Sequence, residues 1–224
     1  MSEPNELATP QEQEKETGRI EAFSDGVFAI AITLLILEIK VPNAHELDAV
    51  GGLGAALFRL WPSYLAFVTS FATILVMWVN HHRLFNHIRR IDHPFLFWNG
   101  LLLFLVTFVP FPTALLAEYL PHAEARLAVR VYSGTFIAIA LAFTALWRHA
   151  STGRRLLARA VNTAEVEQIT RQYRFGPPSY LAAFIASFFS VWLSLAICLG
   201  LAALFASRGP PARRAQRLER RPSP

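Results

Sequence analysis

Long apolar segments alternate with short polar ones along this chain, a pattern that predicts helices crossing a membrane. A helix needs about 20 predominantly apolar residues to span the hydrocarbon core of a bilayer. Four segments meet that length, at residues 20–41, 60–80, 95–117 and 127–147, and a fifth apolar segment covers residues 179–207. We therefore expect an all-α polytopic membrane protein.

The composition excludes the soluble classes of protein. Hydrophobic residues make up 54% of the chain and charged residues only 17%, whereas a soluble domain carries about 25% charged residues. The single cysteine, Cys198, excludes an intrachain disulfide framework and a multi-cysteine metal site. The net charge of +5 comes from basic residues placed between apolar segments. That placement fits membrane topology, and we expect no nucleic-acid partner.

Two polar tails flank the apolar part of the chain. Residues 1–18 are acidic and lack an apolar core, which predicts a disordered N-terminal tail rather than a signal peptide. Residues 208–224 are rich in Arg and Pro and predict a second disordered tail, with a charge suited to anionic lipid. Between them, residues 19–207 form one transmembrane domain without internal repeats. Within it, residues 153–175 are too polar to span and predict an amphipathic surface helix.

The connections between the apolar segments alternate in charge. Basic residues dominate residues 81–93, 148–174 and 208–221, whereas residues 41–58 and 118–126 carry mainly acidic ones. The positive-inside rule places the three basic segments in the cytoplasm. Many Arg and Ala with only two Lys indicate a GC-rich bacterial genome, and hence the inner (cytoplasmic) membrane.

The last apolar segment, residues 179–207, has two possible arrangements. With both termini in the cytoplasm, the chain crosses an even number of times, and this segment then forms a hairpin of two short helices. Trp192 lies near its middle and suits a hairpin tip at the membrane interface. A single long tilted helix, with the tail outside, is the alternative. In the third segment, Pro110 and Pro112 predict a kink near the outer end.

The first predicted helix carries charged side chains inside its membrane segment, where an ionised group has a high cost in free energy. Arg19 and Asp25 lie about 240° apart on the helical wheel, so neither can pair with the other along its own helix. Each needs a partner on another helix or subunit. Candidates at the same depth are Trp78, Asn80, His81, His82 and Asn99.

The same helix carries a stripe of four residues within about 100° of arc, about 140° away from Asp25 when measured at Ile30. The stripe consists of Ile30, Thr33, Leu34 and Leu37. On periodicity alone it is ordinary core packing, because most helices have such a stripe.

The string Arg19-x-x-x-Phe23-Ser24-Asp25 at the start of this helix resembles the signature of the transmembrane protein 175 family of potassium channels. Further strings similar to that family are residues 78–85, 98–99 and 109–113, so the resemblance covers about residues 19–207. Prokaryotic members have one six-helix repeat and assemble as tetramers. The resemblance therefore implies six transmembrane helices here, the last two a short hairpin, and a homotetramer.

The resemblance also implies a function for the stripe. In the family the first helices of the subunits line the pore, and bulky aliphatic side chains form its constriction. Counted from the Asp of the motif, these fall at Ile30, Leu34 and Leu37, with the Thr33 hydroxyl beside them. We expect a passive, moderately selective potassium-conducting channel, with K⁺ as the permeant ion, lipid and other copies of the chain as partners, and no cofactor.

In this scheme the remaining motif residues form a structural network, held mainly by buried hydrogen bonds of its polar members, that keeps the pore helix against its neighbours. They are Arg19, Phe23, Ser24, Asp25, Trp78, His81, His82 and Asn99. A part in gating is a second possibility for them. Glu38 lies near the outer mouth and could concentrate cations, or could be a solvated helix end.

Three other functions compete with this one. A metalloprotein or membrane enzyme is disfavoured. The seven histidines form no His-x-x-x-His string, and the sequence contains no nucleotide-binding motif. We thus expect no catalytic residue and no metal. A secondary transporter would show inverted repeats, and none is visible. A proton-leak channel on the same scaffold remains open.

Overall fold

The computed structural model describes residues 10–158 and 161–207, which are helical almost throughout. In that part of the chain the one β-type pairing is an isolated bridge between Ile88 and Leu157. Four helical segments are long and apolar enough to cross a membrane: Lys15–Glu38, Trp61–Phe85, His93–Tyr119 and Ala125–Arg154. The predicted all-α membrane fold is therefore confirmed at this level. The predicted C-terminal tail lies outside the described residues.

Helix α1 covers Pro10–Leu34 and continues as a 3₁₀ turn, η1, at Leu35–Glu38. The predicted disordered tail is thus wrong over residues 10–18, while residues 1–9 lie outside the described part. Gln, Glu and Lys are good helix formers, and proline is tolerated in the first turn. In addition, Thr17 is buried, and its hydroxyl donates to the carbonyl of Arg89 at 3.5 Å. The extra turns of α1 therefore dock on the connection that follows α4.

The connection after α1, expected to be a loop, contains three short helices: η2 (Ala44–Glu46), α2 (Leu47–Val50) and α3 (Leu53–Arg59). Gly51 and Gly52 adopt φ values of 87° and 92°, which glycine tolerates best, and so separate α2 from α3.

The next two helical segments form the centre of the bundle with α7. Helix α4 covers Trp61–Phe85. The third span is divided into α5 (His93–Phe108) and α6 (Pro110–Tyr119). Proline lacks the N–H that would continue the ladder, so the break at Pro110 confirms the predicted interruption. Helix α7 covers Ala125–Ser151 and ends in η3 (Thr152–Arg154).

Helix α8 covers Thr163–Ala186, and this corrects a prediction. The sequence favours a separate surface helix that ends at residue 175, but the observed helix continues through Pro177 and Pro178. Pro177 cannot bond the carbonyl of Tyr173, four residues earlier. The Thr144 hydroxyl of α7 lies 3.1 Å from that carbonyl and shares its one hydrogen between it and the carbonyl of Ala140, at 2.7 Å. Because the freed carbonyl is satisfied by its neighbour, the helix can run past the proline.

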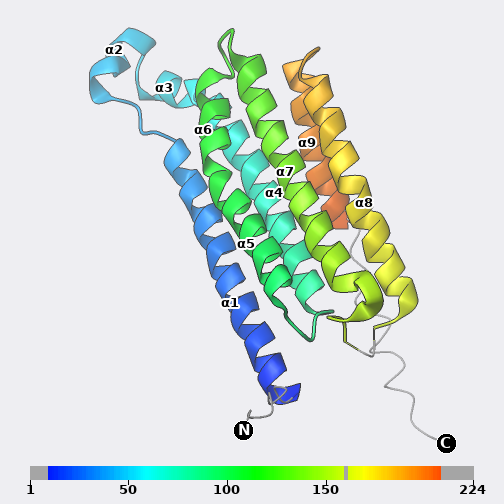
Figure 1. The fold of residues 1–224 in the computed structure, drawn as a ribbon. Helices are drawn as coiled ribbons and strands as arrows, with labels where there is room; N and C mark the ends of the chain where they lie inside the picture. The colour runs from blue at the N-terminus through cyan, green and yellow to red at the C-terminus, as the bar shows by residue number, and fades with distance from the viewer. Residues whose placement is uncertain (1–9, 159–160, 208–224) are drawn as a thin grey trace, which may run out of the picture.

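Residues 179–207 contain the predicted turn and are not the single long helix of the alternative, but the first arm is the end of the 24-residue helix α8 and not a separate short helix. Helix α9 (Val191–Ser207) follows a short turn after α8 and packs against it. Near the turn, Trp192 stacks on Trp61 with ring centroids 5.8 Å apart, and the Ser194 hydroxyl donates to the carbonyl of Ala183. Figure 1 shows α8 and α9 at one edge of the bundle and α1 at the other.

The two basic connections within the described chain meet at one end of the bundle. The backbone N–H of Arg89 donates to the carbonyl of Leu156 at 2.8 Å, and that of Ala158 donates to His87 at 3.0 Å. The segment that contains α2 and α3 lies at the opposite end (Figure 1). The alternation in charge along the sequence therefore becomes a difference between the two ends of the molecule.

Candidate ion pathway on the first helix

One face of α1 is buried against its own chain. Ser24, Phe28, Ala31 and Leu35 are fully buried, and their spacing of three and four residues places them on one side of the helix. This side packs on α4 and α5. The remaining circumference of α1 is largely free of contacts, and α1 is the least buried of the four candidate spans.

The stripe singled out in the sequence lies on the open side of α1. Ile30, Leu34 and Leu37 are 59%, 37% and 66% exposed, and Thr33 is exposed beside them. The Thr33 hydroxyl donates to the carbonyl of Ile30 at 2.9 Å, which leaves its oxygen free to accept. Within one chain, these four residues, the open stripe, are therefore not core packing.

Two residues expected in the buried network belong to the open side instead. Phe23 is 65% exposed, and Arg19 is exposed and makes no hydrogen bond or ion pair among the described residues. Arg19, Phe23 and Ile30 follow one another at intervals of four and seven residues, which keeps them on a single helix face. The prediction that Arg19 and Phe23 enter a buried network is thus wrong for the single chain.

A buried polar triad joins α1 to α4 and α5. The Asn99 side-chain amide donates to the Ser24 hydroxyl at 3.0 Å, and the Asn99 oxygen lies 2.9 Å from His81 Nε2. The Ser24 hydroxyl in turn donates to the carbonyl of Ile20. Since Ser24 donates there, it accepts from Asn99, and this orients the amide so that His81 Nε2 is the donor. Ser24, His81 and Asn99 are all at most 3% exposed.

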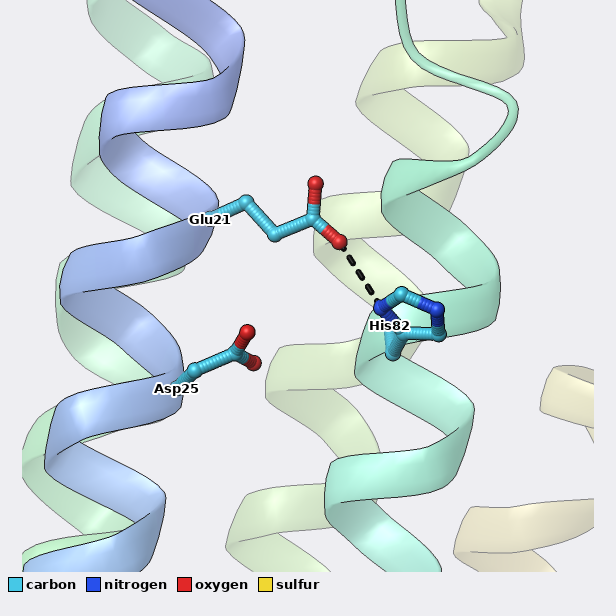
Figure 2. Close-up of side chains that lie close together, drawn as sticks. All are labelled: Glu21, Asp25 and His82. Atoms are coloured by element: carbon cyan, nitrogen blue, oxygen red, sulfur yellow. Dashed lines mark hydrogen bonds and ion pairs between the residues drawn. The ribbon is translucent and has the colours of Figure 1, made fainter.

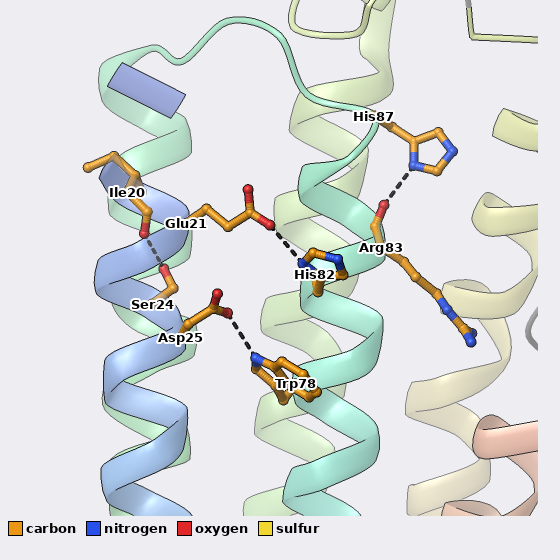
Figure 3. Close-up of polar contacts among 8 residues, drawn as sticks. All are labelled: Ile20, Glu21, Ser24, Asp25, Trp78, His82, Arg83 and His87. Atoms are coloured by element: carbon orange, nitrogen blue, oxygen red, sulfur yellow. Dashed lines mark hydrogen bonds and ion pairs between the residues drawn. The ribbon is translucent and has the colours of Figure 1, made fainter. Parts of the chain in front are cut away.

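A second polar group lies nearer the start of α1. His82 Nδ1 is 2.8 Å from Glu21 Oε1, and Asp25 lies one turn along α1 (Figure 2). Trp78 Nε1 donates to Asp25 Oδ1 at 2.9 Å (Figure 3). Asp25, Trp78 and His82 were expected near one another, but Glu21 was not. Its four-residue spacing from Asp25 is the signal that could have found it.

Two other candidates from the sequence face elsewhere. Asn80 accepts from Gln172 and Tyr173 of α8, so it does not pair with α1. Glu38 lies at the far end of α1, half-buried in a hollow of about 270 Å³ that Lys40 and Glu118 also line. Lys40 offsets one of the two carboxylates in this hollow, so the three side chains together keep a formal charge of −1.

Comparison with known proteins decides the family. The model of the family described as endosomal/lysosomal potassium channel TMEM175 matches residues 19–110. A potassium channel of Chamaesiphon minutus is 65% identical over 196 residues, which are 88% of this chain and 96% of the relative. This chain belongs to the TMEM175 family. A second relative, a potassium channel of Streptomyces collinus, is 48% identical over 85% of this chain and 91% of its own length.

Solved TMEM175 structures share the fold. The crystal structure of a lysosomal potassium-selective channel TMEM175 homolog from Chamaesiphon minutus superposes with a TM-score of 0.80 at 64% identity, over 87% of this chain and 98% of that one.

An endosomal/lysosomal proton channel TMEM175 of Bos taurus is similar in sequence over a shorter region. It is 47% identical over 97 residues, which are 41% of this chain but 20% of its own length.

Proposed function

We propose that this protein is a passive potassium-conducting cation channel, a homotetramer in which four copies of α1 line the pore. The single observation that carries the proposal is the open stripe of α1. It lies on the side of the helix opposite the face packed on α4 and α5, in the least buried span of the bundle. The bacterial relatives named as potassium channels support the choice of ion.

The open stripe is suited to a pore only if several copies meet. One α1 helix cannot enclose a path, whereas closed rotational symmetry brings identical stripes together around an axis. The rings of Ile30, Leu34 and Leu37 would then form a narrow apolar constriction. An ion must shed much of its hydration shell there, which K⁺ does at lower cost than Na⁺, and such a ring can also gate by dewetting. The Thr33 hydroxyls would supply oxygen ligands beside it.

The proposed topology has six spans. Four are the long apolar helices, and α8 with α9 complete the count as a short hairpin. An even number of crossings leaves both termini on the side of the basic connections, which the positive-inside rule assigns to the cytoplasm. The proposed location is the inner (cytoplasmic) membrane of a bacterial cell, and the two bacterial relatives support a bacterial source.

A proton-leak channel on the same scaffold is the second candidate. The mammalian relatives are named proton channels, although they match only part of this chain. A secondary transporter is the third, and nothing in the described helices favours it. Flux per protein and its ion dependence separate the three functions.

The test is ion flux in proteoliposomes with an outward K⁺ gradient, followed by the same gradient of Na⁺ and of protons. We expect fast K⁺ flux and slower Na⁺ flux. Ile30→Asn and Leu34→Asn should raise Na⁺ flux, because a polar ring lowers the cost of hydrated passage.

Ile185→Asn on α8 is the matched control, since Ile185 is 50% exposed and α8 makes no substantial contact with α1. It should conduct as the wild type does. Well-folded protein without K⁺ flux contradicts the channel proposal. Flux of protons alone favours the second candidate, and slow, saturable flux favours a transporter.

A further inference from the structure

We propose that Glu21, Asp25 and His82 form a binding site for a divalent transition-metal ion of the Zn²⁺ class, which joins α1 to α4. Among the described residues, this is the one group of three or more metal-ligating side chains with their ligand atoms close together, all within 4.8 Å of one another. Neither the sequence motifs nor the proposed pore uses Glu21.

The backbone brings the three ligands to one point. Glu21 and Asp25 are four residues apart on α1, so both carboxylates leave the same face of the helix. His82 reaches between them from α4, and its Nδ1 is already 2.8 Å from Glu21 Oε1 (Figure 2). In a tetrahedral Zn²⁺ site, with bonds of about 2.0–2.1 Å, the ligand atoms lie about 3.3 Å from one another. Small side-chain rotations therefore suffice to close the site.

The donor set matches the charge and the coordination preferences of such an ion. Two carboxylates balance a charge of +2, and an imidazole nitrogen favours Zn²⁺ and its neighbours over Mg²⁺ or Ca²⁺. Three protein ligands leave a fourth position for water, as in open zinc sites. Arg83 is next in the sequence, but its guanidinium points away from the two carboxylates (Figure 3).

The surroundings hold the ligands in place and leave an entrance. Trp78 donates to Asp25 Oδ1, which fixes that carboxylate while its second oxygen stays available. The Trp78 ring also stacks on His82, with an angle of 24° between the rings. Such outer hydrogen bonds orient metal ligands and increase affinity. The His82 side chain is 50% exposed and that of Glu21 is 23% exposed, so an ion can enter from solvent.

Metal binding would replace the hydrogen bond between His82 and Glu21 with two bonds to the ion. The ligands bind in their deprotonated forms, so affinity should fall at acid pH. Because the ligands come from two helices, the ion should also stabilise the packing of α1 on α4.

The test is calorimetric titration of the purified, tag-free full chain with ZnCl₂ and then with MgCl₂. We expect one Zn²⁺ per chain and no saturable Mg²⁺ binding at this site. Glu21→Gln, which keeps a hydrogen bond to His82, and His82→Ala at an exposed position should each weaken Zn²⁺ binding at least tenfold. Zinc should raise the melting temperature of the wild type and not that of either variant.

The matched control is His149→Ala. His149 forms a comparable pair with Asp92 at 2.8 Å, but no third ligand joins it among the described residues. This variant should bind Zn²⁺ as the wild type does. Absence of Zn²⁺ binding by the wild type up to millimolar concentration overturns the site. Unchanged affinity in both Glu21→Gln and His82→Ala overturns it as well.

Discussion

The triad of Ser24, His81 and Asn99 is the most buried polar group that joins α1 to the rest of the bundle. Each of its hydrogen bonds lies where no water can replace it, so losing one partner leaves two polar groups without a substitute. Asn99 is the central member, because it contacts both of the others.

Replacing Asn99 by Ala should therefore destabilise the protein by about 1–3 kcal/mol, the cost of leaving buried polar groups unpaired. The measurement is thermal or denaturant unfolding in detergent. Asn86→Ala is the control, because Asn86 is exposed at the end of α4, and it should change stability little. Equal stability of the wild type and Asn99→Ala would show that the triad does not hold α1.

Asp92 combines two roles at the start of α5. Its carboxylate accepts from the backbone N–H of Phe95 at 2.9 Å and from the His149 ring at 2.8 Å. Partial burial by itself raises the pKa of Asp92, but the hydrogen bonds from Phe95 and His149 and the nearby charge of Arg155 lower it below its usual value. A lowered pKa means that the folded state favours the charged form.

Asp92→Ala should cost about 1 kcal/mol at neutral pH through loss of the helix cap. Asp92→Asn keeps a capping oxygen and should lose only the stabilisation that comes from the negative charge of the carboxylate. That stabilisation is present above pH about 4 and disappears as the pH falls through the lowered pKa of Asp92. Unfolding of the two variants and the wild type from pH 3 to 7 checks this. If the difference in stability between the wild type and Asp92→Asn increased as the pH falls, this account would be contradicted.

The sequence predicted the residues of the site better than their partners. The position of Asp25 inside an apolar segment indicated a charged side chain that needs a partner, and Trp78 is that partner. The sequence could not show that Arg19 and Phe23 lie on the open side, because the wheel gives relative angles and not which side meets the bundle. Glu21 was missed because its partner, His82, is distant in sequence, and the one local signal, its four-residue spacing from Asp25, does not name that partner.

At the scale of elements, α1 is a helix with two different faces, and α8 is a helix that passes two prolines. Periodicity located the stripe of α1 but by itself favoured core packing, and only the family resemblance favoured an open stripe; the sequence failed on α8. Proline breaks a helix by freeing a carbonyl, and only tertiary structure shows whether another side chain satisfies that carbonyl. Thr144 does so for Tyr173, and the apolar side of this part of α8, with Val166, Ile169 and Tyr173, packs on the core while its charged residues stay exposed.

Thr144→Val keeps the shape of the side chain but removes the hydroxyl that is shared between the carbonyl of Tyr173 and that of Ala140 in its own helix. It should destabilise the protein by about 1–2 kcal/mol, since a carbonyl freed by proline loses its partner. Thr107→Val is the matched control, because the Thr107 hydroxyl donates only within its own helix, to the carbonyl of Leu103. Unfolding of both variants in detergent distinguishes them. Similar stabilities of the two variants would contradict the proposed role of Thr144.

At the scale of the whole molecule, charge differs between the two ends of the bundle, and packing differs between its two edges. Along the bundle, the basic connections meet at one end through hydrogen bonds between Arg89 and Leu156 and between Ala158 and His87. Across the bundle, α1 lies at one edge with its open stripe facing away from the chain. The first arrangement fits a membrane protein of fixed orientation, and the second fits a subunit that completes its pore with other copies.

The central claim, that the open stripe of α1 lines the ion path, is tested most directly by silver block of K⁺ flux. The chain suits this measurement, because its one native cysteine, Cys198, is buried. Ag⁺ is a monovalent cation that reacts with thiols, so in chloride-free liposomes it should stop flux through Ile30→Cys and Leu37→Cys. Wild-type protein and Ile185→Cys should continue to conduct. Undiminished flux in both stripe variants, with the thiols shown to be reduced, would contradict a pore lined by this stripe.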